Sequence, residues 1–386
     1  MLDCLLNGVQ VICTPFSFCI FTDYLKKRMS AKIKHKFNLD EWLSEHLNFP
    51  DIKDNVMKSI NNFSENLLKD TQSKVNDKLL PVLNGFAGHL LDESNDPRAI
   101  KMSFRYENKD IEISELQNIY DFPKHNGKVC ILIHGLFGDE YMWKNRAHKS
   151  KPKIGDYLEK HVDATILYLR YNTGLHISEN GRSLSNLLEN FSKKYKKEVS
   201  EINLIGHSMG GLVTRSAAYY AGIQRQAWTQ LVKKIFLIGV PNKGSYLAQT
   251  ADFVNELFKK ADVSKDELIS KFLDIRSNGI KDLAYAYLTD EDWLDVRKKR
   301  QEKIKVRPLA GVKYFLIAGT LGKNKIFSTY FGDGLVGSES AVSNELNTNI
   351  FTKVERKVFE KEDHISLLSS KSVADYIIKN LSSENI

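Results

Sequence analysis

The middle and end of the chain alternate short, continuous apolar runs with segments of helical periodicity. The apolar runs are residues 129–133, 165–169, 202–205, 235–240 and 314–318, and residues 354–359 are expected to form the last strand of the set. Between them, one helical face carries Leu184, Leu187, Leu188 and Phe191, and another carries Val373, Tyr376 and Ile377. Continuous apolar runs are typical of strands buried on both faces. Strands alternating with helices predict an α/β fold, with a mainly parallel central sheet and helices on both faces.

A helical pattern precedes this region. Val56, Ile60, Phe63 and Leu67 recur at one-face spacing. Pro81 is expected to break the helix, and a second apolar face begins after it. Residues 38–99 are therefore predicted to form a helical accessory layer on the main domain, with a linker at 93–97. The alternative is an amphipathic segment that meets lipid.

Two further patterns complete the organisation. Residues 102–106 and 110–113 have the character of short strands around Asn108-Lys109, which predicts a hairpin. Residues 241–312 separate two strands by more than an ordinary connection and have a mostly helical pattern. We interpret 241–312 as a cap or lid, with aromatic residues on its underside, inserted into a catalytic domain that spans 100–386.

The first 37 residues form an N-terminal extension with its own character. Residues 4–22 are the longest apolar stretch, but polar positions and Pro15 interrupt it. That pattern is poor for a membrane-spanning helix and lacks the features of a secretory signal. Lys26, Lys27 and Arg28 follow it. Two interpretations stay open, a weak membrane anchor or a poorly structured extension, and Met29 is a candidate for the true start.

Charge and cysteine content exclude some classes of function. The net charge is +8, with basic clusters at 26–28, 193–197 and 297–300. These clusters fit solvated helix faces, or attraction to an anionic membrane surface. No pattern of basic and stacking aromatic residues indicates nucleic-acid binding. The four cysteines form neither a disulfide framework nor a metal site. We expect no metal or cofactor and a reducing, cytoplasmic location, with peripheral membrane contact as an option.

The stretch Gly206-His207-Ser208-Met209-Gly210-Gly211 follows an apolar run directly and opens a helical pattern. A nucleophilic serine needs a sharp strand-to-helix turn that projects its hydroxyl from the sheet. Small residues two positions before and after it relieve the crowding of that turn. The sequence therefore predicts Ser208 as a nucleophile. The N–H of Met209 is expected to stabilise an oxyanion at the helix N-terminus.

Only one histidine can serve as the base if the order of catalytic groups is serine, acid, histidine. Of ten histidines, only His364 follows Ser208, in a loop after the expected strand 354–359. For the acid, Asp333 stands in a glycine-flanked turn after residues 314–318. It would hold the imidazole tautomer and stabilise the imidazolium. Glu339 and Asp363 are weaker rivals.

The stretch His134-Gly135-Leu136-Phe137-Gly138 ends the first central strand. Leu136 is the expected second oxyanion donor, and Phe137 is its rival. Phe137 and His207 are expected to contact substrate. His134 precedes Ser208 and is expected to fix the loop instead of acting as the base.

These stretches together resemble a known family. HGLFG, LRYNTGLHISENG, GHSMGG, GVPNKGS, GDGLVGSESA and the final Asp-His are similar to bacterial esterases and lipases of the α/β-hydrolase superfamily. Among them, the likeness is greatest to lipases related to the GPI inositol-deacylase domain, and it covers residue 128 to the C-terminus. Pro241-Asn242-Lys243-Gly244 and Gly337 depart from the family pattern near the mouth of the site.

The resemblance implies a triad of Ser208, Asp333 and His364, with Leu136 and Met209 as the oxyanion hole. It also implies a carboxylic-ester or lipid-ester substrate with a hydrophobic acyl group. Two alternatives stay open. One is a catalytically inactive lipid- or membrane-binding scaffold with the same fold. The other is a thioesterase or amidase that uses the same triad. The sequence does not determine the oligomeric state.

Overall fold

The structure is a computed structural model that describes residues 2–6, 9–13, 76–146, 151–242, 244, 277–294, 303–320 and 353–383. The chain divides into two compact units. One contains residues 1–76 and 265–275, and the other contains residues 77–264 and 276–386. Each unit is described by itself.

The described part of the smaller unit is a β-hairpin. Strand β1 (Leu2–Leu6) pairs antiparallel with β2 (Val9–Cys13), and Leu2 lies opposite Cys13. Part of the apolar N-terminal stretch is therefore extended chain. Among the described residues, no helix has the length and hydropathy to cross a bilayer. The helical pattern from Val56 to Leu67 lies outside the described residues.

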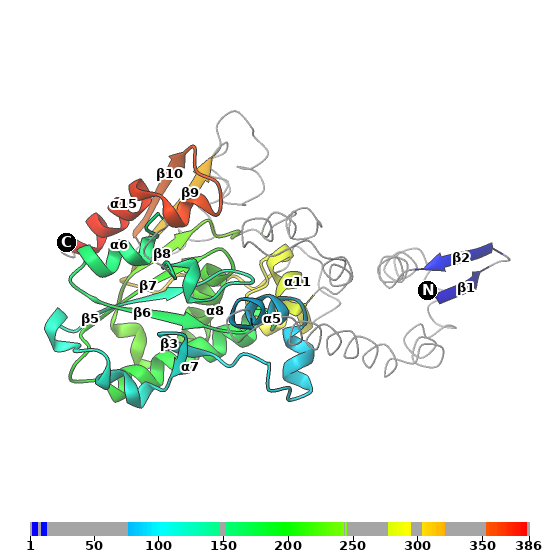
Figure 1. Cartoon of the computed structure of the whole chain (residues 1–386), viewed down its shortest axis with the longest axis horizontal. Helices are drawn as coiled ribbons and strands as arrows, with labels where there is room; N and C mark the ends of the chain where they lie inside the picture. Colours follow the sequence, from blue (N-terminus) through cyan, green and yellow to red (C-terminus); the bar gives the residue numbers. More distant parts are fainter. Residues whose placement is uncertain are drawn as a thin grey trace. The chain divides into compact units, whose positions relative to one another are not determined.

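The larger unit is built on an eight-stranded sheet (Figure 1). Its strands, in chain order, are β3 (Ser103–Tyr106), β4 (Lys109–Ile111), β5 (Lys128–Ile133), β6 (Thr165–Arg170), β7 (Glu201–His207), β8 (Val232–Ile238), β9 (Lys313–Thr320) and β10 (Lys353–Glu360). Their spatial order is β4-β3-β6-β5-β7-β8-β9-β10. All pairs from β6 to β10 are parallel, and β3 is antiparallel to both neighbours. The predicted, mainly parallel sheet is confirmed.

The hairpin of β3 and β4 is also confirmed. Its two turn residues, Glu107 and Asn108, have φ angles of 46° and 66°. Positive φ at both central positions is typical of the turn whose twist matches that of the flanking strands. Asparagine tolerates this conformation better than most residues. The turn lies one residue earlier than the Asn108-Lys109 turn that the sequence predicted, because Lys109 already pairs with Tyr106.

Helices cover both faces of the sheet. On one face, α6 (Ile154–His161) and α15 (Lys371–Ser382) pack over a core that includes Leu132, Phe236 and Phe315. Side chains alternate along a strand, so Ile131 and Leu204 point to the other face. There α7 (Ile177–Lys194) and α8 (Met209–Gln224) pack against each other and α8 contacts β7. This arrangement is the α/β fold with two helical layers that the pattern predicted.

Helix α5 (Asn76–Glu93) corrects one expectation. Pro81 lies inside it and does not end the helix. Proline removes a helical hydrogen bond, but burial of Val82, Leu83, Phe86 and Leu91 against the larger unit compensates. The side chain of Asn84 further anchors the helix, because it donates to Arg98 O and accepts from Ile100 N, both at 2.9 Å. The larger compact unit begins at Asp77, and the boundary of the catalytic domain at residue 100 stays a prediction.

The described part of the insertion 241–312 contains two helices, α11 (Asn278–Tyr285) and α12 (Asp290–Leu294). The Asp282 carboxylate accepts a hydrogen bond of 2.8 Å from the first residue of α7, Ile177. The Trp293 ring stacks on His176 at 3.7 Å and donates to Ser178. Trp293 therefore has a packing role, and both helices contact the N-terminal end of α7 through Asp282 and Trp293. A lid function for the insertion stays a prediction.

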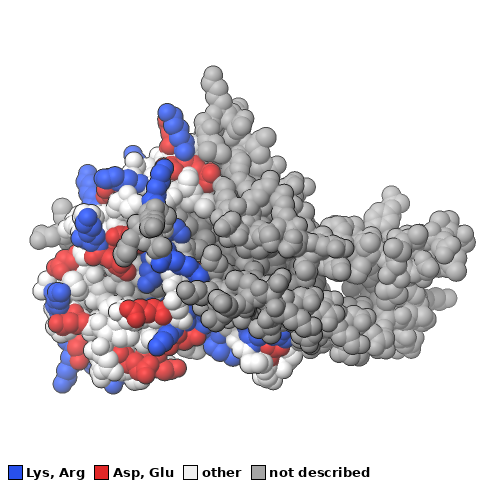
Figure 2. Space-filling view, in the orientation of Figure 1, with Lys and Arg blue, Asp and Glu red and all other residues white. Residues whose placement is uncertain are grey.

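Charged side chains of both signs mix on the described surface seen in Figure 2. Lysine and arginine side chains lie there among aspartate and glutamate side chains. Several ion pairs occur among the described residues, such as Lys371 with Asp375. Of the three basic clusters, residues 26–28 and 297–300 lie outside the described residues, and both interpretations of the charge stay predictions. Contact with a membrane stays a prediction.

Candidate active site

Ser208 occupies the turn between β7 and α8. Strand β7 ends at His207 and α8 begins at Met209, so a single residue makes the change of direction. The backbone of Ser208 has φ 53° and ψ −123°, which is rare for a residue with a side chain. Its N–H donates to Ile238 O at 2.9 Å, and its carbonyl accepts from Gly211 N at 3.0 Å. These bonds hold the strained turn at the end of the sheet.

The glycines around Ser208 allow close backbone packing. A Cβ atom on Gly210 would come within 2.3 Å of Ile133 O, and one on Gly206 within 2.7 Å of the Gly211 Cα. A Cβ on Gly135 would lie 3.0 Å from the Cβ of Ser208. The spacing of glycines that the sequence analysis identified thus follows from the crossing of α8 over β5. It also places the loop after β5 directly beside Ser208.

His364 lies at the same edge of the sheet. It follows β10, whose carboxyl end pairs with that of β9, and it is 7% exposed. A Cβ on Gly239 would come 2.9 Å from His364 Nδ1, so the imidazole lies against the first residue after β8. Ser208 bonds to the residue before it, Ile238. Residues 208 and 364, which are 156 positions apart, therefore flank one end of β8.

His207 supports the loop that carries His364. Its Nε2 lies 3.0 Å from His364 O, and the two ring centroids are 4.5 Å apart. The ring is fully buried and makes an edge contact with Trp143. Burial lowers the pKa of His207 to about 4. His207 has no exposed surface and contacts the His364 loop, and its contact with substrate stays a prediction.

The loop after β5 is held by its own hydrogen bonds. His134 Nδ1 donates to Gly135 O at 2.9 Å, and Tyr171 stacks on the imidazole while its hydroxyl donates to His134 O. Burial lowers the pKa of His134 to about 3, so this histidine is neutral and structural. The loop thus has a defined shape beside Ser208.

The two candidate oxyanion donors of this loop differ in their surroundings. Leu136 is buried at 4% exposure. Phe137 has φ 61°, and its N–H donates to Thr173 Oγ1 at 3.3 Å. Because the Phe137 N–H has this partner, Leu136 is the better candidate. Met209, the other candidate donor, is the first residue of α8 and is fully buried. The Phe137 side chain is half-buried, and its contact with substrate stays a prediction.

Of the three candidate acids, Asp363 lies among the described residues. Asp333 and Glu339 lie outside the described residues. The third candidate, Asp363, accepts hydrogen bonds of 2.8 Å from the N–H groups of Ile365 and Ser366 through one oxygen. This carboxylate shapes the turn after His364, and the choice of Asp333 for the triad stays a prediction.

Sequence reasoning missed the supports of the site. Thr173 holds Phe137, Trp143 packs on His207, and Asn172 donates to Gly88 O in α5 at 3.0 Å. Thr173 and Asn172 belong to the stretch LRYNTGLHISENG, which resembles the family. The resemblance drew attention to this stretch but indicated no role for either residue. No group of three metal-binding side chains occurs among the described residues.

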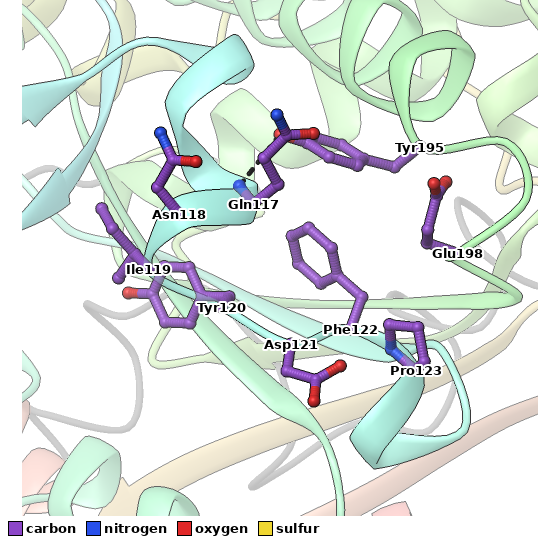
Figure 3. A pocket seen from close by; sticks show the side chains of 9 residues that line it. All are labelled: Gln117, Asn118, Ile119, Tyr120, Asp121, Phe122, Pro123, Tyr195 and Glu198. Atoms are coloured by element: carbon purple, nitrogen blue, oxygen red, sulfur yellow. Dashed lines mark hydrogen bonds between the residues drawn. The ribbon is translucent and has the colours of Figure 1, made fainter.

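Two cavities in the described part of the chain lie away from Ser208. The larger, of about 370 Å³, is formed by residues before β5 and before β7, including Tyr120, Phe122, Tyr195 and Glu198 (Figure 3). In it, Gln117 N–H donates to the Tyr195 hydroxyl. The smaller, of about 150 Å³, includes Lys128. Both are at the amino ends of the strands, opposite the edge with Ser208, and neither is the candidate site.

Comparisons with known proteins found one family model and several solved structures. A family model described as "Domain of unknown function (DUF7379)" matches residues 101–263, which is less than half of the chain. No curated protein matches the chain. Several solved structures are similar to it at low sequence identity.

The mature lipase BlEst2 of Bacillus licheniformis is 15% identical, with a TM-score of 0.41, over 67% of this chain and 93% of that one. Lipase B of Aspergillus fumigatus is 10% identical, with a TM-score of 0.43, over 69% and 55%. The RedJ thioesterase from the prodiginine pathway of Streptomyces coelicolor is 12% identical, with a TM-score of 0.40, over 66% and 89%. The chain's own sheet, helical layers and turn at Ser208 are those of an α/β-hydrolase fold.

Proposed function

We propose that the protein is a serine hydrolase that cleaves carboxylic esters through an acyl-enzyme on Ser208. The backbone of Ser208 carries this proposal. A left-handed, strained residue between a buried strand and a helix costs on the order of 1–3 kcal/mol and tends to occur at functional sites. The same geometry aims a serine hydroxyl away from the sheet in enzymes of this fold.

In the proposed reaction, His364 accepts the proton of Ser208 Oγ while that oxygen attacks the ester carbonyl. The N–H groups of Met209 and Leu136 stabilise the oxyanion, and Asp333 holds the imidazolium. The C–O bond to the alcohol then breaks, and His364 donates the proton to the leaving alcohol. Water repeats the sequence on the acyl-enzyme, which releases the acid and regenerates Ser208.

A hydrophobic acyl group is the proposed substrate class. Phe137 lies beside the proposed oxyanion donor, and its ring contacts Phe86 at a centroid distance of 4.6 Å. Apolar side chains at this position suit an acyl chain better than a charged group. The sequence likeness to lipases related to the GPI inositol-deacylase domain supports the same substrate class.

The decisive experiment compares ester hydrolysis by the wild type and by Ser208→Ala, with Ser369→Ala as the control. Ser369 is an exposed serine in the turn after His364. With p-nitrophenyl esters of graded chain length, we expect Ser208→Ala to lose roughly 10⁶-fold in kcat. Ser369→Ala should match the wild type. Equal rates for wild type and Ser208→Ala would refute the proposal.

Two further measurements define the activity. A fluorophosphonate probe should label the wild type and Ser369→Ala but not Ser208→Ala, because only an activated serine reacts. An unlabelled wild type would favour the inactive scaffold. Oxygen esters and thioesters of the same acyl group should be compared for kcat/KM, and a preference for thioesters would change the substrate class while the triad is kept.

A further inference from the structure

Helix α5 lies in sequence ahead of the expected catalytic domain, yet it packs on the loop that carries the proposed oxyanion donor. A Cβ atom on Gly85 would come 2.0 Å from Cδ1 and 2.4 Å from Cε1 of Phe137. The Phe86 ring lies 4.6 Å from the Phe137 ring, at an angle of 36°. Phe137 therefore has its ring seated on a glycine of α5 and flanked by the next residue of the same helix.

The helix also packs on the turn that holds the backbone of Phe137. Thr173 accepts the hydrogen bond from the Phe137 N–H. At the next residue, Gly174, an added Cβ atom would lie 2.1 Å from Asn84 O in α5. A Cβ on Gly88 would lie 1.8 Å from Asn172 Oδ1, and Asn172 donates to Gly88 O at 3.0 Å. Residues 172–174 and α5 are thus in backbone contact, with no room for an added methyl group.

These contacts act on a residue of unusual conformation. Phe137 has φ 61°, in a region that a bulky side chain rarely adopts. Such a conformation persists only where the surroundings over-determine it. Of the contacts around Phe137 described above, the Thr173 hydroxyl fixes its backbone, and Gly85 and Phe86 of α5 fix its ring.

We propose that α5 is a positioning element of the active site: Gly85 seats the Phe137 ring and thereby sets the backbone of the loop that presents the Leu136 N–H to the oxyanion. Gly85 acts through Phe137 and touches no reacting atom. The inference rests on the proposed function, because it explains what positions the Leu136 N–H, the second proposed oxyanion donor.

The test is Gly85→Ala, with Gly222→Ala as the matched control. Both are glycines within helices, but a Cβ on Gly222 meets nothing within 4 Å. We expect Gly85→Ala to lower kcat about 100-fold, the effect of a displacement of about 1 Å at a catalytic group. KM should stay within about twofold, because the oxyanion interaction forms in the transition state. Gly222→Ala should retain the wild-type kcat and KM.

A double-variant cycle separates positioning from general damage. In a Phe137→Ala background, the added methyl at residue 85 has no ring to displace. There Gly85→Ala should change kcat by no more than about threefold. An equal loss in both backgrounds would overturn the inference, as would an unchanged kcat in Gly85→Ala.

A further variant covers the case in which Gly85→Ala does not fold. Phe86→Leu keeps an apolar side chain on α5 but removes the ring contact with Phe137. We expect its kcat to fall about tenfold, because the loop that carries Phe137 should move less than in Gly85→Ala. An unchanged kcat would overturn the inference. If the wild type hydrolyses no ester and takes no fluorophosphonate label, the proposed function and the inference fail together. If the wild type is active, the variants test the inference by itself.

Discussion

His207 Nε2 lies 3.0 Å from the carbonyl oxygen of His364. Because a carbonyl oxygen only accepts, Nε2 carries the proton of this imidazole. His207 is also the last residue of β7 and directly precedes Ser208. One side chain therefore links the strand of the proposed nucleophile to the loop of the proposed base.

This link predicts different results for two substitutions of His207. A glutamine can place its amide nitrogen near the position of Nε2 and donate to His364 O, whereas a leucine cannot. We expect His207→Leu to lower kcat about 100-fold through displacement of the His364 loop. His207→Gln should stay within about tenfold of the wild type. Steady-state ester hydrolysis measures both, and equal losses in the two variants would contradict the role of the hydrogen bond.

Stability should depend on pH through the two buried histidines. Burial lowers the pKa of His134 to about 3 and of His207 to about 4, against 6.5 for an ordinary histidine. Below pH 6.5 the unfolded chain takes up protons that the native protein does not. The free energy of unfolding therefore falls as pH is lowered from 6.5 towards 4, by about 1.4 kcal/mol per pH unit for each histidine.

Urea unfolding at pH 7.5 and pH 5.5 tests this expectation. The His207→Gln variant has one titrating group fewer, so its loss of stability between the two pH values should be smaller by about 1.4 kcal/mol. Ser369→Ala, which removes no titrating group, is the control. The same pH dependence in the wild type and in His207→Gln would show that His207 is not buried as a neutral group.

Gly239 should be required for the placement of His364. Gly239 and Gly311 both have positive φ, 57° and 76°. Alanine at either site should cost roughly 1–2 kcal/mol of stability, because a Cβ is disfavoured in this conformation. Only at Gly239 would the new methyl group approach the His364 imidazole, whereas Gly311 faces open space.

Thermal unfolding and ester hydrolysis should therefore separate the two glycine variants. We expect similar losses of Tm, but a loss of kcat of about 100-fold for Gly239→Ala alone. A Gly239→Ala protein with the wild-type kcat would mean that His364 does not depend on this contact.

Asp333 can be tested against Asp363 as the acid of the triad. Asp333→Asn should lower kcat by roughly 10⁴-fold, because an amide holds the wrong imidazole tautomer. In Asp363→Asn the amide oxygen can still accept from Ile365 and Ser366, so a loss below about tenfold is expected. The kcat values of the two variants decide the assignment, and a larger loss in Asp363→Asn would reverse it.

The centre of the sheet could be predicted because β5, β6, β7, β8 and β9 are buried and mainly apolar in sequence. The turn at Ser208 could be predicted because the crossing of α8 over β5 requires glycine at fixed positions. The extent of α5 could not. Pro81 is a local signal for a helix end, but the contacts of Asn84 with residues 98 and 100 outweigh it.

The supporting contacts of the site also escaped prediction from sequence. His207 was expected to contact substrate, and its hydrogen bond to the His364 loop was not foreseen. Its partner is a main-chain oxygen 157 positions away, and any residue type would present that oxygen. Thr173 likewise binds the main chain of Phe137. Contacts between a side chain and a distant backbone leave no pattern in one sequence.

The conformation of Ser208 has a consequence for how this chain can change over time. Glycine would occupy φ 53°, ψ −123° without the steric penalty that any side chain meets there. Substitution of the nucleophile by glycine should therefore make the protein harder to unfold while abolishing its chemistry. Selection for stability and selection for turnover oppose each other at this one position. A descendant released from the need for catalysis would be expected to lose its serine early, and to gain thermal tolerance by doing so.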